Sequence, residues 1–280
     1  MHEILYQDIV KAVSALCIEA NCRLPADIRE ALRRARETEQ SSVGQSMLQD
    51  AVNNFTYAAS NTLPICQDTG MAVVFCALGQ EAHIAGGLLE DAVNEGVRQG
   101  YSRGYLRCSV VQDPLRRTNT NDNTPAVLHL RLTEGDQLRI TVAPKGFGSE
   151  NMTALRMFNP SVTQREIEDF IVQTVDRAGS NPCPPVIVGV GLGGTSEYAA
   201  LLAKRALLIS QDQPNGDPYY ADMEERLFRR INCLGIGPQG LGGTVTALGV
   251  HILPYPTHIA GLPCAVNLGC HVTRHASTVL

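Results

Sequence analysis

Hydrophobic residues recur at helical spacing through the first sixty positions of the chain. The positions with this spacing are Ile4, Val10, Val13, Leu16, Cys17 and Ala20, and they are typical of the buried face of an amphipathic helix. A second helix is expected from Pro25, because its first turn is acidic and its end carries arginines, as the helix dipole favours. A third is expected over residues 42–59, so the pattern predicts a helical N-terminal region over residues 1–60.

Beyond residue 60, short apolar runs alternate with segments of helical periodicity. They predict strands over residues 71–78, 128–132, 137–143, 185–190 and 248–253, and helices over residues 88–100, 163–179, 195–209 and 220–233. This mixture indicates an α/β (mixed α+β) fold, in which a mixed β-sheet with glycine-rich loops follows the helical region. We expect one domain over residues 1–280, with the α/β part over residues 61–280.

Two local signals sharpen this prediction. Residues 133–136, Thr-Glu-Gly-Asp, form a turn sequence between two of the expected strands, so residues 128–132 and 137–143 are predicted to pair as a hairpin. Thr163 and Glu166 stand three residues apart before an apolar-periodic run, which is the pattern of a capping box at a helix N-terminus.

Composition and charge narrow the class of protein. The chain has 280 residues, of which 44% are hydrophobic, and its net charge is only −5, so it can bury enough apolar surface to fold. A mildly acidic chain has no electrostatic footprint for nucleic acid or anionic membranes. No apolar run approaches the ~20 residues that span a bilayer, and no signal peptide opens the chain. We therefore expect a cytoplasmic protein with neither nucleic-acid nor membrane partners.

The nine cysteines fall into two groups. No C-x-x-C pair occurs among them, so neither a zinc ribbon nor a ferredoxin-type cluster is indicated. Six stand in ordinary or apolar surroundings and are expected to be small buried hydrophobes, namely Cys17, Cys22, Cys76, Cys108, Cys233 and Cys264. The other three, Cys66, Cys183 and Cys270, lie beside polar or glycine-rich loops, where functional sites are usually built.

Two glycine patterns of the form G-x-G-x-x-G leave three interpretations open. They are formed by Gly189, Gly191 and Gly194 and by Gly235, Gly237 and Gly240. The first follows an expected strand and opens an expected helix, and Asp212 lies roughly 20 residues beyond it, so it could bind a dinucleotide and serve a nicotinamide-dependent oxidoreductase. Such a loop could equally line an anion or substrate site, or simply allow tight packing.

Five ordered motifs make the chain similar to a known family. They are PICQDTG at residues 64–70, PKGFGSEN at 144–151, CPP at 183–185, GIGPQGLGG at 235–243 and HIAGLPCAVNLGC at 258–270. Together they resemble the α region of class I fumarate hydratases, an oxygen-sensitive iron–sulfur family that includes L-tartrate dehydratase. The resemblance extends from about residue 41 to the C-terminus. Phe147 departs from it, because the family more often has a third consecutive glycine there.

The resemblance implies a metal centre and several site residues. Its three cysteine ligands of a four-iron, four-sulfur (4Fe-4S) cluster correspond to Cys66, Cys183 and Cys270, and one iron would remain open as a Lewis acid. Asp68 would handle a proton, although an aspartate in this sequence could simply cap a turn. Gln67 would reach the substrate or the iron-bound water.

Further substrate contacts are expected from other loops. His258 would line the pocket, although it could be an ordinary loop histidine. Arg107 is a candidate for binding a substrate carboxylate, with a surface arginine as the alternative, and Gly146 and Gly148 would let backbone N–H groups approach a second carboxylate. The histidines that follow Cys270 are not expected to bind the metal.

The resemblance implies the α subunit of an iron–sulfur hydro-lyase that reversibly hydrates fumarate to malate. The alternatives are dehydration of L-tartrate or a methyl-substituted dicarboxylate, the nicotinamide-dependent oxidoreductase, and a non-catalytic paralogue that holds no iron. The chain ends at Leu280, whereas single-chain members continue into a β region that supplies substrate contacts. We therefore expect a β subunit as partner.

Overall fold

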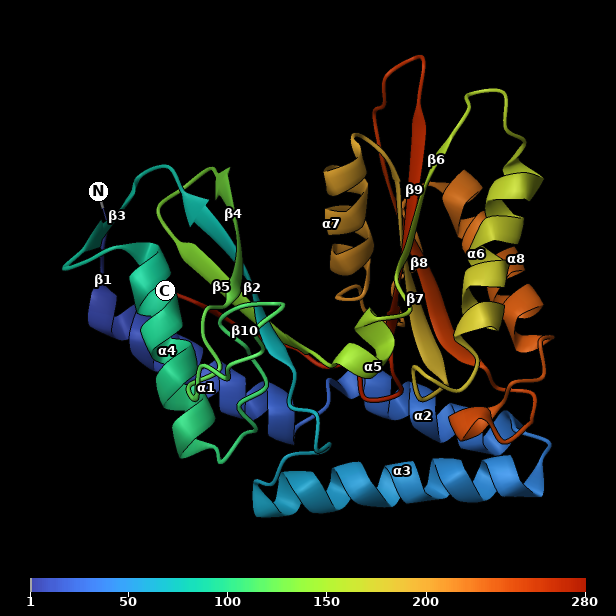
Figure 1. The fold of residues 1–280 in the computed structure, drawn as a ribbon, viewed down its shortest axis with the longest axis horizontal. Helices are drawn as coiled ribbons and strands as arrows, with labels where there is room; N and C mark the ends of the chain where they lie inside the picture. Colours follow the sequence, from blue (N-terminus) through green and yellow to red (C-terminus); the bar gives the residue numbers. More distant parts are fainter. Residues whose placement is uncertain (1) are drawn as a thin grey trace. The chain divides into compact units, whose positions relative to one another are not determined.

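The computed structural model describes residues 2–280, which form two compact units (Figure 1). Unit 1 combines Met1–Pro25, Asn54–Phe147 and Arg274–Leu280, and unit 2 combines Ala26–Asn53 and Gly148–Thr273. The predicted fold class is confirmed, since helices dominate the N-terminal region and mixed sheets with interspersed helices follow.

Unit 1 is built on a mixed four-stranded sheet in the order β10-β5-β2-β4. Its elements are β1 (His2–Leu5), α1 (Tyr6–Cys22), β2 (Met71–Gly79), β3 (Ala82–Ala85), α4 (Leu89–Arg103), β4 (Val127–Thr133), β5 (Leu138–Lys145) and β10 (Ala276–Val279), and α3 (Ser42–Asn61) ends in it. Ile4, expected in the first helix, lies instead in β1, which pairs in parallel with β3.

Helices α1 and α4 pack closely because α4 presents glycines to α1. A Cβ atom at Gly96 would stand 2.6 Å from Cβ of Val13, and one at Gly100 would stand 2.8 Å from Cβ of Cys17. Both helices contribute to one apolar core with strands β2 and β5. The core therefore holds the start of β2, and with it the loop that carries Cys66, in a fixed place.

The predicted hairpin over residues 128–143 is wrong. Strand β2 lies between its two halves, pairing in parallel with β4 and antiparallel with β5. The connecting turn passes over the end of β2, where a Cβ atom at Gly79 would stand 2.2 Å from the carbonyl oxygen of Gly135. Gly79 also donates its N–H to the carbonyl of Gln137 at 2.8 Å. A glycine at the end of β2 thus admits the turn and lets β2 replace the expected direct pairing.

Unit 2 contains a second four-stranded sheet, in the order β6-β9-β7-β8. Its elements are α2 (Ala26–Thr38), α5 (Phe147–Glu150), β6 (Ala154–Phe158), α6 (Gln164–Ala178), β7 (Val186–Gly193), α7 (Ser196–Ala206), α8 (Pro218–Asn232), a 3-10 turn (Pro238–Gly240), β8 (Ala247–Tyr255) and β9 (Leu262–Gly269), with the first part of α3. The predicted capping box is confirmed, because Thr163 and Glu166 each accept a hydrogen bond from the backbone N–H of the other.

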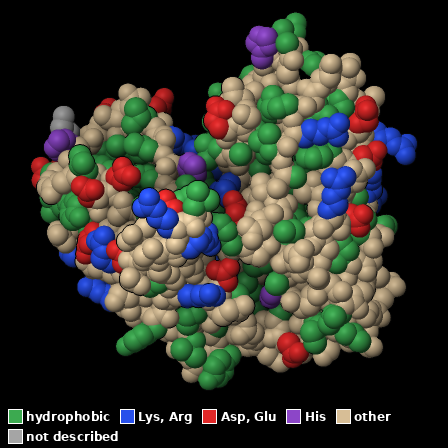
Figure 2. All heavy atoms as spheres, in the orientation of Figure 1, with side chains coloured by type: hydrophobic (Ala, Val, Ile, Leu, Met, Phe, Trp, Pro, Cys, Tyr) green, Lys and Arg blue, Asp and Glu red, His purple; other side chains and the backbone are tan. Residues whose placement is uncertain are grey.

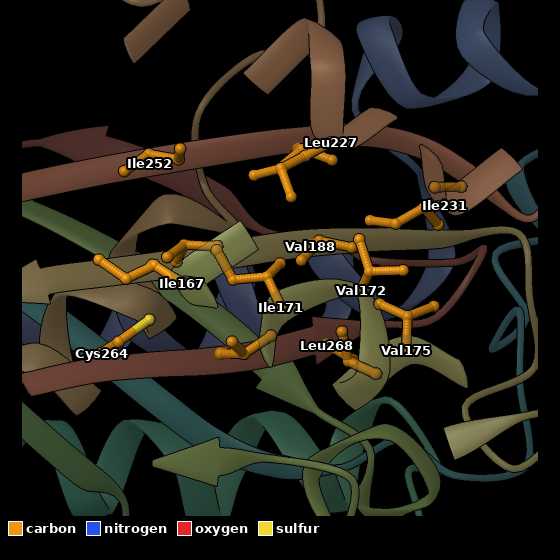
Figure 3. Packing of buried hydrophobic residues seen from close by; sticks show 14 of the residues in the cluster. Ile167, Ile171, Val172, Val175, Val188, Leu227, Ile231, Ile252, Cys264 and Leu268 are labelled. Atoms are coloured by element: carbon orange, nitrogen blue, oxygen red, sulfur yellow. The ribbon is translucent and has the colours of Figure 1, made fainter. Parts of the chain in front are cut away.

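Helices cover both faces of this sheet (Figure 1). On one face, α6 and α8 pack on the strands through Ile167, Ile171 and Leu227, which meet Val188 and Ile252 in the apolar core drawn in Figure 3. On the other face, α7 contributes only small alanines to a separate cluster.

The small residues under α7 explain the first glycine pattern. A Cβ atom at Gly189 would stand 2.2 Å from the carbonyl oxygen of Ala203, and one at Gly191 would stand 2.0 Å from that of Ala199. These glycines therefore let the backbone of α7 lie directly against β7, which is the tight-packing interpretation. Asp212, the expected ribose acceptor, forms an ion pair with Arg34 at 3.2 Å.

Acidic and basic side chains are interspersed on the face drawn in Figure 2, in agreement with the small net charge. Among residues 2–280, no helix combines the length and the apolar character required to cross a membrane.

Candidate functional site

Cys66 lies on the loop between α3 and β2 in unit 1. Its side chain is partly exposed, and its sulfur receives the backbone N–H of Asp68 at 3.4 Å. A second polar contact joins Cys66 Sγ to Oε1 of Gln67 at 3.3 Å. A backbone N–H in this position can also donate to the sulfur of a metal-bound cysteine.

The Asp68 carboxylate joins two loops of unit 1. Its Oδ1 accepts the N–H of Gly70 at 3.0 Å, and its Oδ2 accepts the N–H of Phe147 at 2.9 Å. A Cβ atom at Gly146 would stand 3.0 Å from Oδ2, so the absence of a side chain there leaves room for the carboxylate. The turn-capping alternative for Asp68 is thus present in the structure, together with a contact to the loop predicted to bind substrate.

Arg107 lies beside the Cys66–Asp68 loop, and its backbone is hydrogen-bonded to Thr69. Its N–H donates to Oγ1 of Thr69 at 2.9 Å, and its carbonyl accepts from that hydroxyl at 3.3 Å. The buried Tyr101 hydroxyl then donates to the carbonyls of Thr69 and Gly70 at 2.9 and 3.0 Å. The Arg107 side chain is exposed, so unit 1 brings together Cys66, Gln67, Asp68, Arg107 and Gly146 on neighbouring loops and leaves the guanidinium accessible.

Arg274 belongs to this arrangement although the sequence did not single it out. It is only 4% exposed, and its Nη2 donates to the carbonyl of Asp68 at 2.6 Å. Its Nε donates to Oδ1 of Asn21 at 3.1 Å, and the carbonyl of Asn21 accepts the N–H of Ile65 at 2.9 Å. The buried guanidinium of Arg274 thus holds the Cys66–Asp68 loop in place through hydrogen bonds. The available signal was its place four residues after Cys270.

In unit 2, the chain segments of Cys183 and Cys270 lie next to each other. The carbonyl of Cys183 accepts the N–H of His271 at 3.2 Å and lies 3.0 Å from Nδ1 of the same residue. Cys183 is exposed, with a left-handed φ of 54°, and Cys270 is partly exposed at the end of β9. Thr273 caps this end by donating its N–H and hydroxyl to the carbonyl of Cys270, at 2.9 and 2.7 Å.

The remaining cysteines differ from these three in their surroundings. Burial raises the pKa of Cys17, Cys76 and Cys264 to about 12, and it also raises that of Cys22, so these thiols stay protonated at neutral pH. The expectation of burial fails for the other two. Cys108 is partly exposed, and Cys233 is exposed just after α8. All nine cysteines are free thiols in the structure.

His258 and Gly148 lie in unit 2. His258 is exposed on the connection between β8 and β9, where its Nδ1 accepts the N–H of Ala260 at 3.1 Å. This local bond is what an ordinary loop histidine would make. A Cβ atom at Gly148 would stand 3.3 Å from the carbonyl oxygen of Asn181, on the loop before Cys183.

Glu150, within the 144–151 motif, makes contacts that the sequence did not predict. Its Oε1 forms an ion pair with Nζ of Lys204 at 2.6 Å, and its Oε2 accepts from Nδ2 of Asn267 at 2.9 Å. Asn267 is buried on β9, three residues before Cys270. The motif is therefore tied to α7 and to the strand that leads to the third cysteine.

A buried carboxylate organises the second glycine loop. Glu39 is 2% exposed and accepts the N–H groups of Ser41, Thr244 and Val245 at 2.8 to 3.0 Å. Burial would raise the pKa of Glu39, but these hydrogen bonds outweigh it and lower the pKa below its usual value. A Cβ atom at Gly243 would stand 2.7 Å from this carboxylate. An internal side chain thus occupies the loop where an anionic ligand was one of the alternatives.

No group of three or more His, Cys, Asp or Glu side chains within residues 2–280 has the geometry of a metal site. Cys66 belongs to unit 1, whereas Cys183 and Cys270 belong to unit 2. The assignment of these three as ligands therefore remains a prediction that rests on the family resemblance and on the character of the three loops.

Comparison with known proteins identifies the family of the chain. A family model described as Fumarate hydratase (Fumerase) matches residues 10–279. The chain is 37% identical over 275 residues to the putative L(+)-tartrate dehydratase subunit alpha of Methanocaldococcus jannaschii, covering 96% of each chain. It is 30% identical over 261 residues to the L(+)-tartrate dehydratase subunit alpha of Escherichia coli K12, covering 92% of this chain and 86% of the relative. Neither comparison supports a nicotinamide-dependent oxidoreductase, and the chain belongs to the α-subunit family of class I fumarate hydratases and tartrate dehydratases, which are iron–sulfur hydro-lyases.

Proposed function

We propose that the chain is the α subunit of a hydro-lyase for a small hydroxy-dicarboxylate, with L(+)-tartrate as the preferred substrate. The observation that carries this proposal is the identity of 37% with a relative named for L(+)-tartrate, over 96% of both chains. Fumarate, which the motifs placed first, is the second candidate because the matching family model bears its name. A methyl-substituted dicarboxylate is a third possibility of the same chemistry.

Cys66, Cys183 and Cys270 are the proposed ligands of a 4Fe-4S cluster. The donor set fits such a group, because all three are free thiols on loops with access to solvent, whereas four others are buried with raised pKa values. The N–H of Asp68 that points at the Cys66 sulfur also suits a metal-bound thiolate. When bound, a cluster with one incompletely ligated iron supplies Lewis acidity at the substrate hydroxyl.

The proposed role of Asp68 is proton transfer. Elimination of water removes a proton from one carbon and a hydroxyl group from its neighbour, and a positioned carboxylate can accept or return a proton. Two backbone N–H groups hold the Asp68 carboxylate in one orientation, and the Arg274 guanidinium holds its carbonyl. This fixed placement supports a catalytic role in addition to turn capping.

The proposed substrate contacts come from the neighbouring loops. The exposed guanidinium of Arg107 can bind a carboxylate through two parallel hydrogen bonds. Gln67 would bind the substrate beside it, and the backbone N–H groups at Gly146 and Gly148 are the proposed contacts of a second carboxylate. His258, exposed and held only by a local hydrogen bond, would line the pocket.

We further propose that a β subunit completes the enzyme. The relatives are named as alpha subunits, and within residues 2–280 we assign an acid–base role to Asp68 alone. A specific heteromeric contact is expected to bury at least ~1,000 Å². Residues 258–270 are the proposed neighbours of that interface, and His258 and Ile259 are both exposed at its start.

A substrate panel tests this proposal. The chain should be co-expressed with its β subunit, purified without oxygen, and given L(+)-tartrate, malate, fumarate and a methyl-substituted dicarboxylate. The expected result is the highest kcat/KM with L(+)-tartrate and little activity from the chain alone. A higher kcat/KM with malate or fumarate would make the fumarase function correct, and turnover of none of the four would overturn the hydro-lyase proposal.

A further inference from the structure

The backbone at Cys183, Pro184 and Pro185 offers carbonyl groups, but few N–H groups, to the rest of unit 2. Cys183 is followed by Pro184 and Pro185, which have no N–H to donate. The N–H of Cys183 itself is used within the loop, where it donates to the carbonyl of Ser180 at 3.0 Å. A hydrogen-bond donor elsewhere in unit 2 can therefore reach residues 183–185 through the carbonyls of Cys183 and Pro184.

Gln239 and His271 donate to those two carbonyls. The backbone N–H of Gln239 donates to the carbonyl of Pro184 at 2.8 Å, and its side-chain Nε2 donates to the same oxygen at 3.1 Å. Nε2 also lies 3.2 Å from Nδ1 of His271, the residue whose N–H donates to the carbonyl of Cys183. One glutamine thus contacts both the residue after Cys183 and the residue after Cys270.

The backbone conformation at position 239 suits glycine better than glutamine, so it is the side-chain contacts that favour a glutamine there. Gln239 has φ 55° and ψ 14°, a left-handed conformation that favours glycine. Its neighbours Gly237, Gly240 and Gly242 also have positive φ values. A glycine at 239 would relieve the backbone strain and keep the N–H bond to Pro184, but it would lose every side-chain contact.

The glycine-rich segment that carries Gln239 is itself held in place by other parts of unit 2. Glu39 holds its C-terminal part by accepting the N–H groups of Thr244 and Val245. In its middle, a Cβ atom at Gly240 would stand 2.3 Å from Cβ of Ser180, which lies at the start of the Cys183 loop. Gln239 therefore projects from a segment that packs closely on the Cys183 loop and is held at Thr244 and Val245.

We propose that Gln239 is a positioning residue, whose side-chain amide fixes the Cys183 loop against the Cys270–His271 segment and so sets the spacing of two cluster ligands. This inference rests on the proposed cluster, but the hydrogen bonds themselves can be tested without metal.

The test uses amide hydrogen exchange at His271 in the metal-free full-length chain. Gln239→Leu keeps the size and removes the donor, and Gln239→Gly keeps the backbone bond and removes the side chain. Gln173→Leu, at an exposed position of α6, is the control for the first variant, and Arg117→Gly, at an exposed left-handed residue with φ 61°, is the control for the second. The exchange of core amides such as Val266 reports global stability.

We expect the His271 amide to exchange about fivefold faster in both Gln239 variants, the factor expected from the loss of one ordinary hydrogen bond. Core exchange should not change, and neither control should accelerate His271. Unchanged His271 exchange, or acceleration shared equally by His271 and the core amides, would overturn the positioning role.

Anaerobic reconstitution with iron and sulfide then tests the effect on the ligands. In both Gln239 variants the electron paramagnetic resonance signal of the dithionite-reduced cluster should broaden, and the visible absorbance of the unreduced cluster should decay several-fold faster under a chelator than in the controls. Faster His271 exchange with an unaltered signal and unaltered decay would overturn the link to the cluster. A wild-type chain that binds no iron would instead overturn the proposed cluster, while the exchange result would still decide whether Gln239 fixes the loop.

Discussion

Arg274 donates from Nη2 to the backbone carbonyl of Asp68 at 2.6 Å, although the two residues are 206 positions apart. Both belong to unit 1, where the guanidinium also binds Asn21. The segment that follows the third predicted iron ligand therefore supports the loop of the first ligand. The position of Asp68, the proposed proton-transfer residue, thus depends on Arg274, which no nearby sequence motif identifies.

Replacing this cation should destabilise unit 1. Arg274→Met leaves the carbonyl of Asp68 and the amide oxygen of Asn21 without their charged donor, at a cost of about 2–3 kcal/mol in the free energy of unfolding. Urea unfolding measures this change, and alkylation of Cys66 should become faster as its loop loosens. The control is Arg139→Met on β5, an exposed site where about 0.5 kcal/mol or less is expected. Equal stability of the two variants would contradict the supporting role of Arg274.

The ligand assignment predicts a specific loss of iron. Cys66→Ser, Cys183→Ser and Cys270→Ser should each prevent formation of a stable cluster, because a serine hydroxyl is a poor ligand for iron in such a site. Cys233→Ser, at an exposed cysteine after α8, is the matched control and should retain about four irons per chain. Iron content and the visible spectrum after anaerobic reconstitution give the result, and full iron content in all three loop variants would show the assignment to be wrong.

Asp68→Asn separates chemistry from turn capping. The amide can accept only with its oxygen, so one of the two N–H bonds from Gly70 and Phe147 is lost, at a cost of about 1 kcal/mol in stability. Loss of the proton acceptor should lower kcat by about 10²–10⁴-fold with the iron content retained. Steady-state kinetics of the complex with the β subunit measure this, and turnover near that of the wild type would leave Asp68 as a turn residue.

His251 predicts a pH dependence of stability. Burial lowers the pKa of this histidine to about 4, against a small opposing effect of Asp27, so His251 is neutral at pH 7. The unfolded chain binds a proton near pH 6.5, and therefore stability is fully present above pH 6.5 and is lost as the pH falls towards 4. The loss due to this group is about 3 kcal/mol.

Urea unfolding between pH 7 and 4 measures the His251 effect. His251→Met should flatten the decline in this window, since it removes the group that takes up the proton. His83→Gln, at an exposed histidine of β3, should leave the decline unchanged. A decline of the same size in His251→Met would place its origin elsewhere.

The packing role of the first glycine pattern is also testable. Gly191→Ala places a Cβ atom 2.0 Å from the carbonyl oxygen of Ala199, so α7 must move away from β7 and stability should fall by about 3 kcal/mol. Gly216→Ala is the control, because nothing lies within 4 Å of its Cβ position. Thermal unfolding distinguishes the two, and a Gly191→Ala variant as stable as the control would contradict the packing interpretation.

Features encoded by neighbouring residues could be predicted, and those made by distant residues could not. The capping box of Thr163 and Glu166 lies within one helical turn, so its sequence pattern was sufficient. The hairpin prediction is wrong because β2, which lies more than fifty residues upstream, pairs with both β4 and β5 and separates them. The turn sequence between β4 and β5 gave no sign of this.

The candidate site follows the same rule. The loops of Cys66, Cys183 and Cys270 were identified by family motifs, each of which is short and continuous. Arg274, Glu39 and Gln239 act on those loops or their supports across distances of 55 to more than 200 residues. Gln239 lies within the motif at residues 235–243, but no sequence pattern showed which distant segments these three residues contact.

The closing of unit 1 by β10 has a consequence for synthesis on the ribosome. Strand β10 pairs with β5, and Leu280 exchanges both backbone hydrogen bonds with Leu138 at 2.9 Å. Residues 274–280, which are translated after all of unit 2, are therefore needed to complete unit 1. Residues 148–273 of unit 2 emerge earlier as one continuous stretch. The nascent chain must keep α1 and β5 from wrong partners until β10 has emerged, so folding of unit 1 starts before that of unit 2 and finishes after it.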